Sequence, residues 1–119
     1  LIAKGIRITL TGVYAPHQIF IAAALGAEDA APYLGRINDL GRDGRADLAT
    51  MLQAIVGVNS SLRLLVASIR SVEDITWLAT HGSNTFTFSP TIAAEFFAVP
   101  ATEQAAIEFE QAAGRMEKG

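Results

Sequence analysis

The feature that most constrains the fold is a strict alternation of strand-like and helix-like segments along the chain. Four segments are predicted strands: 6–11 and 62–69 are rich in branched apolar residues, 85–88 alternates Thr with Phe, and 29–33 is short and contains Pro32, which is unfavourable inside a sheet. A helix-like stretch follows each of them, and three glycines, Gly26, Gly57 and Gly82, stand where such helices end. Strands that alternate with helices form parallel sheets through right-handed crossovers. The sequence therefore predicts an α/β fold of four parallel βα units followed by a C-terminal helix.

Local signals predict where the helices begin and end. Helices are expected at residues 17–25, 46–56, 71–81, 91–97 and 102–113. Ser71 and Ser89 are expected N-caps, and Pro90 suits a first helical position. The Gly- and Asp-rich run 35–44 is expected to be an irregular loop.

The ends of the chain carry two further expectations. The last helix is expected to stop before Gly114, which predicts a single domain at 1–114 and a frayed tail at 115–119. The first residue is Leu1 rather than Met, and residues 1–5 resemble the end of a helix closed by glycine. This start predicts a fragment, a proteolysed product or a partial gene.

Four βα units fit two architectures. They make either an open doubly wound sheet or half of a (β/α)8 barrel. No Gly-x-Gly-x-x-Gly motif follows the first strand, so nothing supports dinucleotide binding.

Composition excludes several classes of function. The chain has no cysteine, hence no disulfide framework and no thiol nucleophile, which suits a cytoplasmic protein. The net charge is −3 without a basic stripe, so no nucleic-acid partner is expected. The longest apolar run, 19–25, is too short to span a bilayer, so no membrane association is expected. The histidines, His17 and His81, lack ligand-type neighbours, and we expect neither a metal nor a cofactor.

Polar residues stand at the carboxyl ends of the predicted strands, where (β/α)8 barrels carry their chemistry. Thr11, Tyr33, and Ser68 with Arg70 lie at three strand ends, and Arg36 follows Tyr33 by three residues. Two guanidinium forks and a hydroxyl suit a phosphate group. Spacing alone leaves this phosphate site as one of two interpretations.

The other interpretation gives these residues ordinary structural roles. Arg36 would pair with Asp39 or Asp43, and Arg70 with Asp74, on a solvated rim. A solvated or half-buried structural position is also the plainer interpretation of the two remaining strand-end residues, Thr11 and Tyr33.

Three motifs resemble a known family. They read ITLTGVY at 8–14, APYLGRIND at 31–39 and VASIR at 66–70. They resemble the fifth, sixth and seventh strands of transaldolases and of their close relatives, the fructose-6-phosphate aldolases. The resemblance covers nearly all of the chain, and its second and third motifs together are the specific part. It implies the C-terminal half, strands five to eight, of a (β/α)8 TIM barrel.

The resemblance implies roles for the strand-end residues. Arg36, Ser68 and Arg70 would bind the phosphate of a sugar phosphate substrate. Thr11 would help to hold a catalytic water, and Tyr33 matches an aromatic that acts as a proton-transferring phenol in the aldolase branch. The implied parent reaction is transfer or cleavage of a dihydroxyacetone unit from a ketose phosphate through a lysine Schiff base, in the pentose phosphate pathway of carbohydrate metabolism.

The family's lysine stands on the fourth strand, which this chain does not include. The chain has only Lys4 and Lys118, one before the first predicted strand and one in the predicted tail. A Schiff base needs a desolvated amine at the mouth of the barrel, so we expect the chain to be inactive by itself. Asn38 replaces a more usual acidic residue of the second motif and receives no role.

A half-barrel leaves two strand edges and a lumen uncovered. We therefore expect self-association, either as a two-fold pair that rebuilds eight strands or as a mouth-to-mouth stack. The alternative function is a non-catalytic half-barrel module that binds phosphate esters or dimerises. An upstream coding sequence that contains the lysine strand would favour an enzyme fragment. A start codon just before Leu1 would favour the non-catalytic module. An unrelated open α/β sheet would require the motif match to be accidental.

Overall fold

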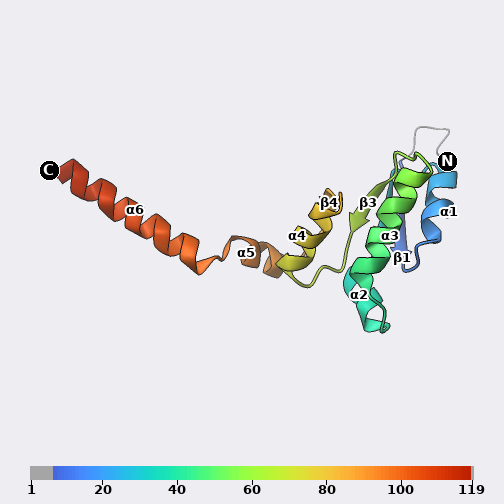
Figure 1. The fold of residues 1–119 in the computed structure, drawn as a ribbon, viewed down its shortest axis with the longest axis horizontal. Helices are drawn as coiled ribbons and strands as arrows, with labels where there is room; N and C mark the ends of the chain where they lie inside the picture. Colours follow the sequence, from blue (N-terminus) through green and yellow to red (C-terminus); the bar gives the residue numbers. More distant parts are fainter. Residues whose placement is uncertain (1–6, 119) are drawn as a thin grey trace.

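The computed structural model describes residues 7–118, which form a four-stranded sheet, its covering helices and a long terminal helix (Figure 1). In chain order the elements are β1 (Thr9–Val13), α1 (Gln18–Leu25), β2 (Asp29–Pro32), α2 (Leu34–Asp39), α3 (Gly44–Gly57), β3 (Arg63–Val66), α4 (Val72–Thr80), β4 (Thr85–Phe86), α5 (Pro90–Phe97) and α6 (Pro100–Lys118). The expected end of a helix at residues 1–5, with Lys4, lies outside the described residues.

The sheet decides between the two predicted architectures. Its strands stand in the order β1-β2-β3-β4, and each pairs with the next in parallel. A doubly wound sheet reverses its strand order at a switch point, whereas a barrel adds each strand on the same side of the last. With right-handed crossovers, a sheet wound in one direction carries its helices on one face. The predicted half-barrel is therefore confirmed, and the doubly wound alternative is wrong.

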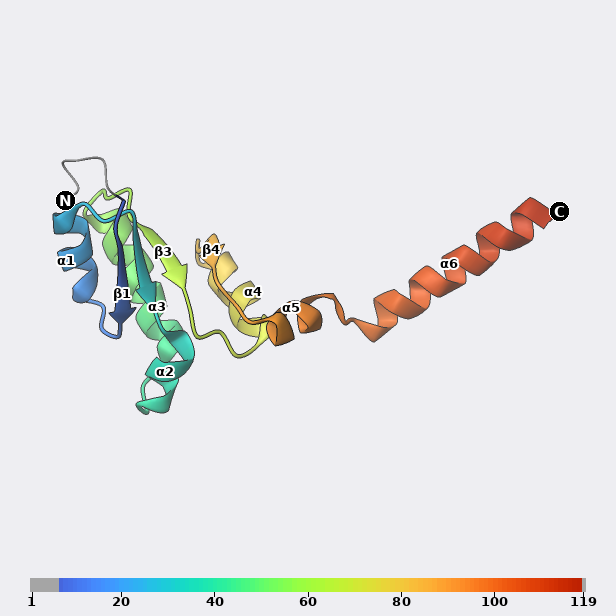
Figure 2. The same cartoon turned by 180° about the vertical axis from the view of Figure 1, so that it is seen from behind.

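The hydrophobic core lies between the sheet and its helices. Figure 2 shows α1 and α3 alongside the strands. The core includes strand residues Val13, Ala30, Leu64 and Val66 and helix residues Ile19, Ala22, Leu34, Ile37, Leu48, Met51, Ile55, Ile75, Leu78 and Ile92. Successive strand side chains alternate between faces, so the other face carries Thr9, Thr11 and Leu65, which are exposed or half-buried. That face, the open face of the sheet, would line the lumen of a complete barrel.

A β-bulge in β1 keeps its apolar residues on the helix side. Leu10 pairs with Ala30 and Val13 with Pro32, so β1 has one extra residue between these two pairs. Gly12, with φ of 66°, supplies the left-handed backbone that such a bulge needs. Leu10 and Val13 therefore both reach the core although they are three residues apart, and Thr11 stays on the open face.

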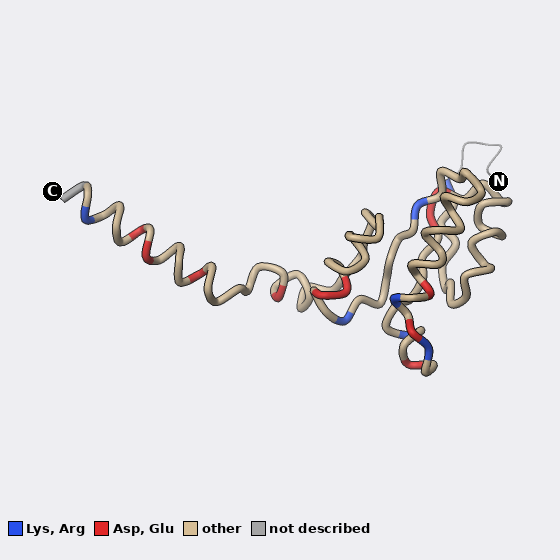
Figure 3. Tube along the Cα trace, viewed as in Figure 1, with Lys and Arg blue, Asp and Glu red and all other residues tan. Residues whose placement is uncertain are grey.

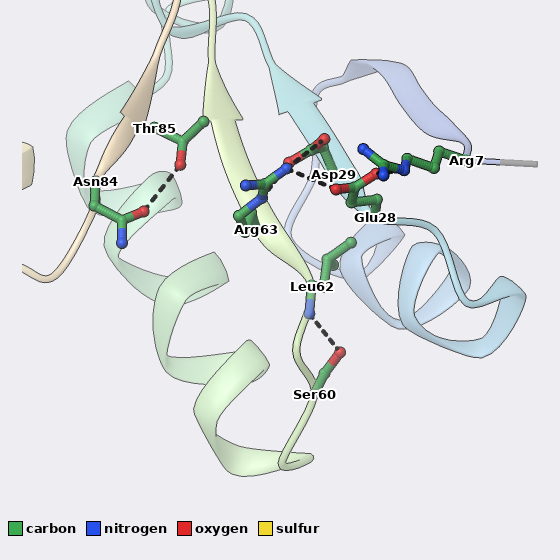
Figure 4. Close-up of polar contacts among 8 residues, drawn as sticks. All are labelled: Arg7, Glu28, Asp29, Ser60, Leu62, Arg63, Asn84 and Thr85. Carbon is green, nitrogen blue, oxygen red and sulfur yellow. Dashed lines mark hydrogen bonds and ion pairs between the residues drawn. The ribbon is translucent and has the colours of Figure 1, made fainter.

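An ion-pair cluster closes the amino-terminal end of the open face (Figure 4). Asp29 pairs in register with Arg63, and the Arg63 Nε donates to Asp29 Oδ1 over 2.9 Å. The second arm of Arg63 donates to Glu28 Oε1 over 3.0 Å, and Arg7 Nε lies 3.8 Å from Glu28 Oε2. The bond to Asp29 is the main cause that raises the pKa of Arg63. The open face is thus charged at this end.

The predicted caps are confirmed. The Ser71 hydroxyl accepts from the Asp74 amide over 3.3 Å, and the Ser89 hydroxyl from the Ile92 amide over 3.3 Å. Pro90 is the first residue of α5, and Gly26 ends α1 with φ of 71°.

The expected loop at 35–44 is wrong in its first half, which forms α2 (Leu34–Asp39). Leu34 and Ile37 are fully buried, and their spacing of three residues places both on one face of a helical turn. Burial of this face outweighs the unfavourable helix propensity of Gly35. The irregular connection begins only at Leu40 and includes Gly41, whose φ is 79°.

The predicted strands 62–69 and 85–88 are shorter than expected, and the predicted strand 6–11 is displaced. β3 ends at Val66 rather than 69, because Ser68 takes a φ of 57° that no strand continues. β4 has only two residues. β1 lies at Thr9–Val13 instead of 6–11, since the Gly12 bulge lets pairing continue to Val13.

The expected end of the last helix before Gly114 is also wrong. The helix α6 runs through Gly114 to Lys118, so residues 115–118 are not a frayed coil. A glycine inside an exposed helix costs only about 1 kcal/mol, which the flanking helix formers offset. α6 extends away from the sheet in both ribbon views, and the molecule measures 67 × 37 × 25 Å (Figures 1 and 2).

Candidate functional site

A cavity opens at the carboxyl ends of β2 and β3. It has a volume of about 300 Å³ and is lined by Tyr33, Arg36, Ala67 and Ser68. Tyr33 directly follows β2, Arg36 lies in α2, and Ser68 follows β3 by two residues. Three of the five residues singled out from the sequence thus meet in one cavity.

Backbone hydrogen bonds hold the walls of this cavity together. The Leu34 amide donates to the Ala67 carbonyl over 3.0 Å, and the Gly35 amide donates to the Ser68 carbonyl over 2.8 Å. These bonds satisfy amide groups in the first turn of α2, which have no partner inside the helix. The first turn of α2 is therefore fastened to the segment after β3, and Arg36 is carried to Ser68.

Gly35 makes this close approach feasible. A Cβ atom at this position would lie 2.5 Å from Arg70 Nε and 2.7 Å from the Ser68 carbonyl oxygen. Real Cβ atoms do not approach backbone so closely, so only glycine fits here without a shift.

Ser68 has a strained backbone, with φ of 57°. Left-handed conformations are uncommon for residues other than glycine, and they cluster at functional sites. Asn59 has a similar φ of 53°, but it stands in a turn, and asparagine tolerates that conformation well. Ser68 is therefore the described position where such strain coincides with a cavity.

Aromatic rings support the Arg36 side of the cavity. The guanidinium carbon of Arg36 lies 5.2 Å from the centre of the Tyr33 ring, which meets the Tyr14 ring edge-on at 5.6 Å. The neighbouring Tyr14 hydroxyl raises the pKa of Arg36, chiefly by hydrogen bonding. The Gln18 side chain holds the Tyr14 backbone by accepting from its amide over 2.8 Å.

Tyr14 was missed as a site residue by sequence reasoning. It lies after the Gly12 bulge, so the alternation of a regular strand does not predict its direction. Its place in the first motif, directly after a strand end, is the signal that points to it.

Arg70 lies outside the lining of the cavity and forms an ion pair with Asp39. Its Nη1 donates to Oδ1 over 2.5 Å and its Nη2 donates to Oδ2 over 2.7 Å. The pair raises the pKa of Arg70 and lowers the pKa of Asp39, in both cases chiefly by hydrogen bonding. Ser68 and Arg70 were expected at the carboxyl end of their strand, but β3 ends at Val66, before either residue.

The ion pairs of the alternative interpretation, Arg36 with Asp39 or Asp43 and Arg70 with Asp74, do not form between these described residues. Asp74 accepts from Arg45 over 2.9 Å, and Asp43 caps α3 by accepting from the Ala46 amide over 3.1 Å. Figure 3 shows basic and acidic positions interspersed around α2, whereas every charged position between Arg70 and Arg115 is acidic.

Thr11 and Asn38, two further residues of the motifs, lie outside the lining of the cavity. Thr11 is exposed on the open face of β1 and does not line the cavity. Asn38, which received no role from the sequence, accepts from the Gly44 amide over 2.8 Å and so joins α2 to α3. Its role is structural.

A larger cavity, of about 480 Å³, lies at the opposite end of the sheet. It is walled by residues from the end of α3, the start of β3 and the turn after α4, among them Leu52, Ile55, Leu62 and Ser83. Barrel enzymes work at the carboxyl ends of their strands. The smaller cavity is therefore the candidate active site.

Two kinds of feature are absent from the described part of the chain, a metal-binding cluster and a membrane-spanning helix. Within residues 7–118, no three His, Cys, Asp or Glu side chains gather in a way that could hold a metal ion. Among the helices of the same residues, none is long and apolar enough to cross a membrane.

Comparison with known proteins identifies the family. The family model described as transaldolase/fructose-6-phosphate aldolase matches residues 1–118. A probable transaldolase of Bartonella henselae is 32% identical over 87% of this chain and 48% of its own length. Those of Thermus thermophilus and Geobacillus kaustophilus are each 29% identical, over 87% and 89% of this chain and 46% and 50% of their own lengths.

The chain spans about half the length of the curated relatives it matches. The matched region includes all three motifs and the cavity between β2 and β3. With a family model matching nearly every residue, the chain belongs to the transaldolase/fructose-6-phosphate aldolase family.

Proposed function

We propose that this chain is the phosphate-binding half of a barrel that acts on a ketose phosphate. The parent reaction is the transfer or cleavage of a dihydroxyacetone unit through a Schiff base, in cytoplasmic pentose phosphate metabolism. Arg36, Ser68 and Arg70 bind the phosphate, while Thr11 and Tyr33 serve the catalytic water and the proton transfer. The reaction needs no cofactor, because the covalent step uses a lysine amine.

The observation that carries this proposal is the cavity lined by Tyr33, Arg36 and Ser68. Arg36 brings a permanent positive charge, and Ser68 brings a hydroxyl that donates to an anionic oxygen. Both belong to backbone segments tied together by the bond between the Gly35 amide and the Ser68 carbonyl. Such preorganised donors favour a phosphate over a neutral group.

Replacing Arg36 by glutamine is expected to weaken the binding of inorganic phosphate by the purified chain. A hydrogen bond to a charged group contributes about 1.5–3 kcal/mol, which corresponds to a loss of roughly 10- to 100-fold in affinity. Isothermal titration calorimetry at fixed ionic strength measures the affinity. Arg115→Gln, on exposed α6, removes the same charge outside the cavity and serves as the matched control. Equal affinity in wild type and Arg36→Gln would refute the site.

The covalent step is not available to this chain alone. Neither Lys4 nor Lys118 belongs to a strand of the sheet in the described region. We therefore propose that the chain binds the substrate's phosphate but does not form the Schiff base. The non-catalytic alternative shares this phosphate site and differs only in having no parent enzyme.

We also propose that the chain self-associates. β1 and β4 are the two edge strands, and a two-fold axis along the barrel would pair β4 of one copy with β1 of the next in parallel. Large apolar side chains are exposed outside the core, including Phe20, Phe97 and Phe109. Sedimentation velocity at micromolar concentration is expected to show a dimer or larger species. A single monomeric species would contradict the proposal.

A further inference from the structure

The Arg70 side chain is fixed at both ends although it is largely exposed. Its inner end crosses Gly35 so closely that a Cβ there would stand 2.5 Å from Nε. Its outer end meets Asp39 in a two-bond, end-on pair, with the shorter distances of charged hydrogen bonds. A long exposed arginine normally samples many rotamers, so this two-point fixation is unusual.

The end-on pair leaves part of the guanidinium available. Arginine has five N–H donors, and the bonds to Asp39 use one on Nη1 and one on Nη2. The remaining three, including the one on Nε, can bind a second anion along another edge of the same plane. The pair with Asp39 therefore orients Arg70 without saturating it.

Asp39 also lies near both arginines. It stands three residues after Arg36 in α2, on the neighbouring turn of the same helix face. Arg70 is the main cause of the lowered pKa of Asp39, and Arg36 contributes as well. The pKa of Arg36 is raised, chiefly by Tyr14, and the charge of Arg70 opposes that rise, which places the two guanidinium groups within each other's field.

We propose that Asp39 is a positioning residue, which holds the guanidinium of Arg70 at the rim of the cavity so that it faces the same phosphate group as Arg36. Asp39 offsets the repulsion between the two cations in the free protein and removes rotamer freedom from Arg70 before the anion arrives. The inference rests on the proposed phosphate site and extends it to a residue that does not touch the phosphate.

Replacing Asp39 by alanine is expected to weaken binding of inorganic phosphate roughly 2- to 10-fold, the usual cost of ordering one flexible side chain on binding. A weaker affinity is diagnostic, because removing the negative charge of Asp39 would otherwise strengthen the attraction of phosphate. Calorimetric titrations of wild type, Asp39→Ala, Arg70→Ala and the double variant form a cycle that isolates the coupling. In the Arg70→Ala background, loss of Asp39 is expected to cause no weakening.

A conservative variant and a spectroscopic readout separate positioning from a general structural effect. Asp39→Glu keeps the charge and both oxygens and is expected to recover part of the affinity. The Nη signals of Arg70 in ¹⁵N NMR are expected to show restricted rotation of the guanidinium in wild type, because both Nη atoms donate to Asp39, and to lose this restriction in Asp39→Ala. Because both side chains are more than half exposed, at 54% and 56%, the variant is expected to fold normally.

The outcomes distinguish the two proposals. If wild type binds no phosphate, the proposed function fails and the role of Asp39 fails with it. If wild type binds phosphate and Asp39→Ala binds it equally or more tightly, the phosphate site stands, and Asp39 is a competitor for Arg70 rather than its positioning residue.

Discussion

Replacing Gly35 by alanine is expected to lower the free energy of unfolding by about 1–3 kcal/mol, the usual cost of forcing an extra group into packed structure. The new Cβ would lie 2.5 Å from Arg70 Nε, 2.7 Å from the Ser68 carbonyl oxygen and 2.8 Å from Arg70 Cζ. Arg70 can rotate away, but the Ser68 carbonyl is backbone. The first turn of α2 must therefore move, which lengthens the bond from the Gly35 amide to Ser68.

The same substitution is expected to impair phosphate binding, because it separates Arg36 from Ser68. Urea unfolding followed by the fluorescence of Trp77, the only tryptophan, measures the stability, and calorimetry measures the affinity. Gly57→Ala is the matched control, since nothing lies within 4 Å of a Cβ at the last residue of α3. This control is expected to be neutral or to stabilise by up to about 1 kcal/mol, as alanine is the better helix former. A Gly35→Ala protein as stable as the control would contradict the packing argument.

Borohydride reduction of the purified chain with fructose 6-phosphate is expected to yield no covalent adduct. A nucleophilic lysine at pH 7 needs a pKa lowered by burial or by neighbouring cations. Lys118 is the last residue of α6, and that helix leads away from the sheet in both ribbon views. Lys4 precedes β1 in the sequence and lies outside the described residues, whereas the candidate cavity lies at the carboxyl ends of the strands.

Intact-mass spectrometry reads this result directly, with a full-length transaldolase treated in parallel as the positive control. Variants Lys4→Arg and Lys118→Arg identify the source of any background labelling. A stoichiometric adduct on the chain would overturn the proposal that it cannot perform the covalent step alone. Its position would then identify the reacting amine.

Much of the local structure could be predicted from the sequence because the signals for it are local. The Ser71 and Ser89 caps and the Gly26 helix end depend on residues within one turn of each other, and all three are confirmed. The failure at α2 has the opposite cause. Gly35 normally disfavours a helix, but here α2 forms because Leu34 and Ile37 are buried in the hydrophobic core, where α2 packs against α3.

The candidate site follows the same division. The strand-end rule correctly indicated that Tyr33 and Ser68 lie near each other, because parallel strands end at one edge of a sheet. The alternation of strand side chains does not predict the direction of Arg70, since β3 ends at Val66 and Ser68 then takes a left-handed conformation. Tyr14 lies beyond a bulge, where this alternation also fails.

The sequence by itself determined the order of strands and helices, the family motifs and the shortage of lysines, because each depends on residue types and short-range spacing. Only the tertiary structure decided that the sheet winds in one direction and that Asp39 rather than Asp74 is the partner of Arg70. It also decided that Gly35 leaves room for the Arg70 side chain and the Ser68 carbonyl. The last two features join residues 31 and 35 positions apart, and their energies arise only when the folded chain brings the partners into contact.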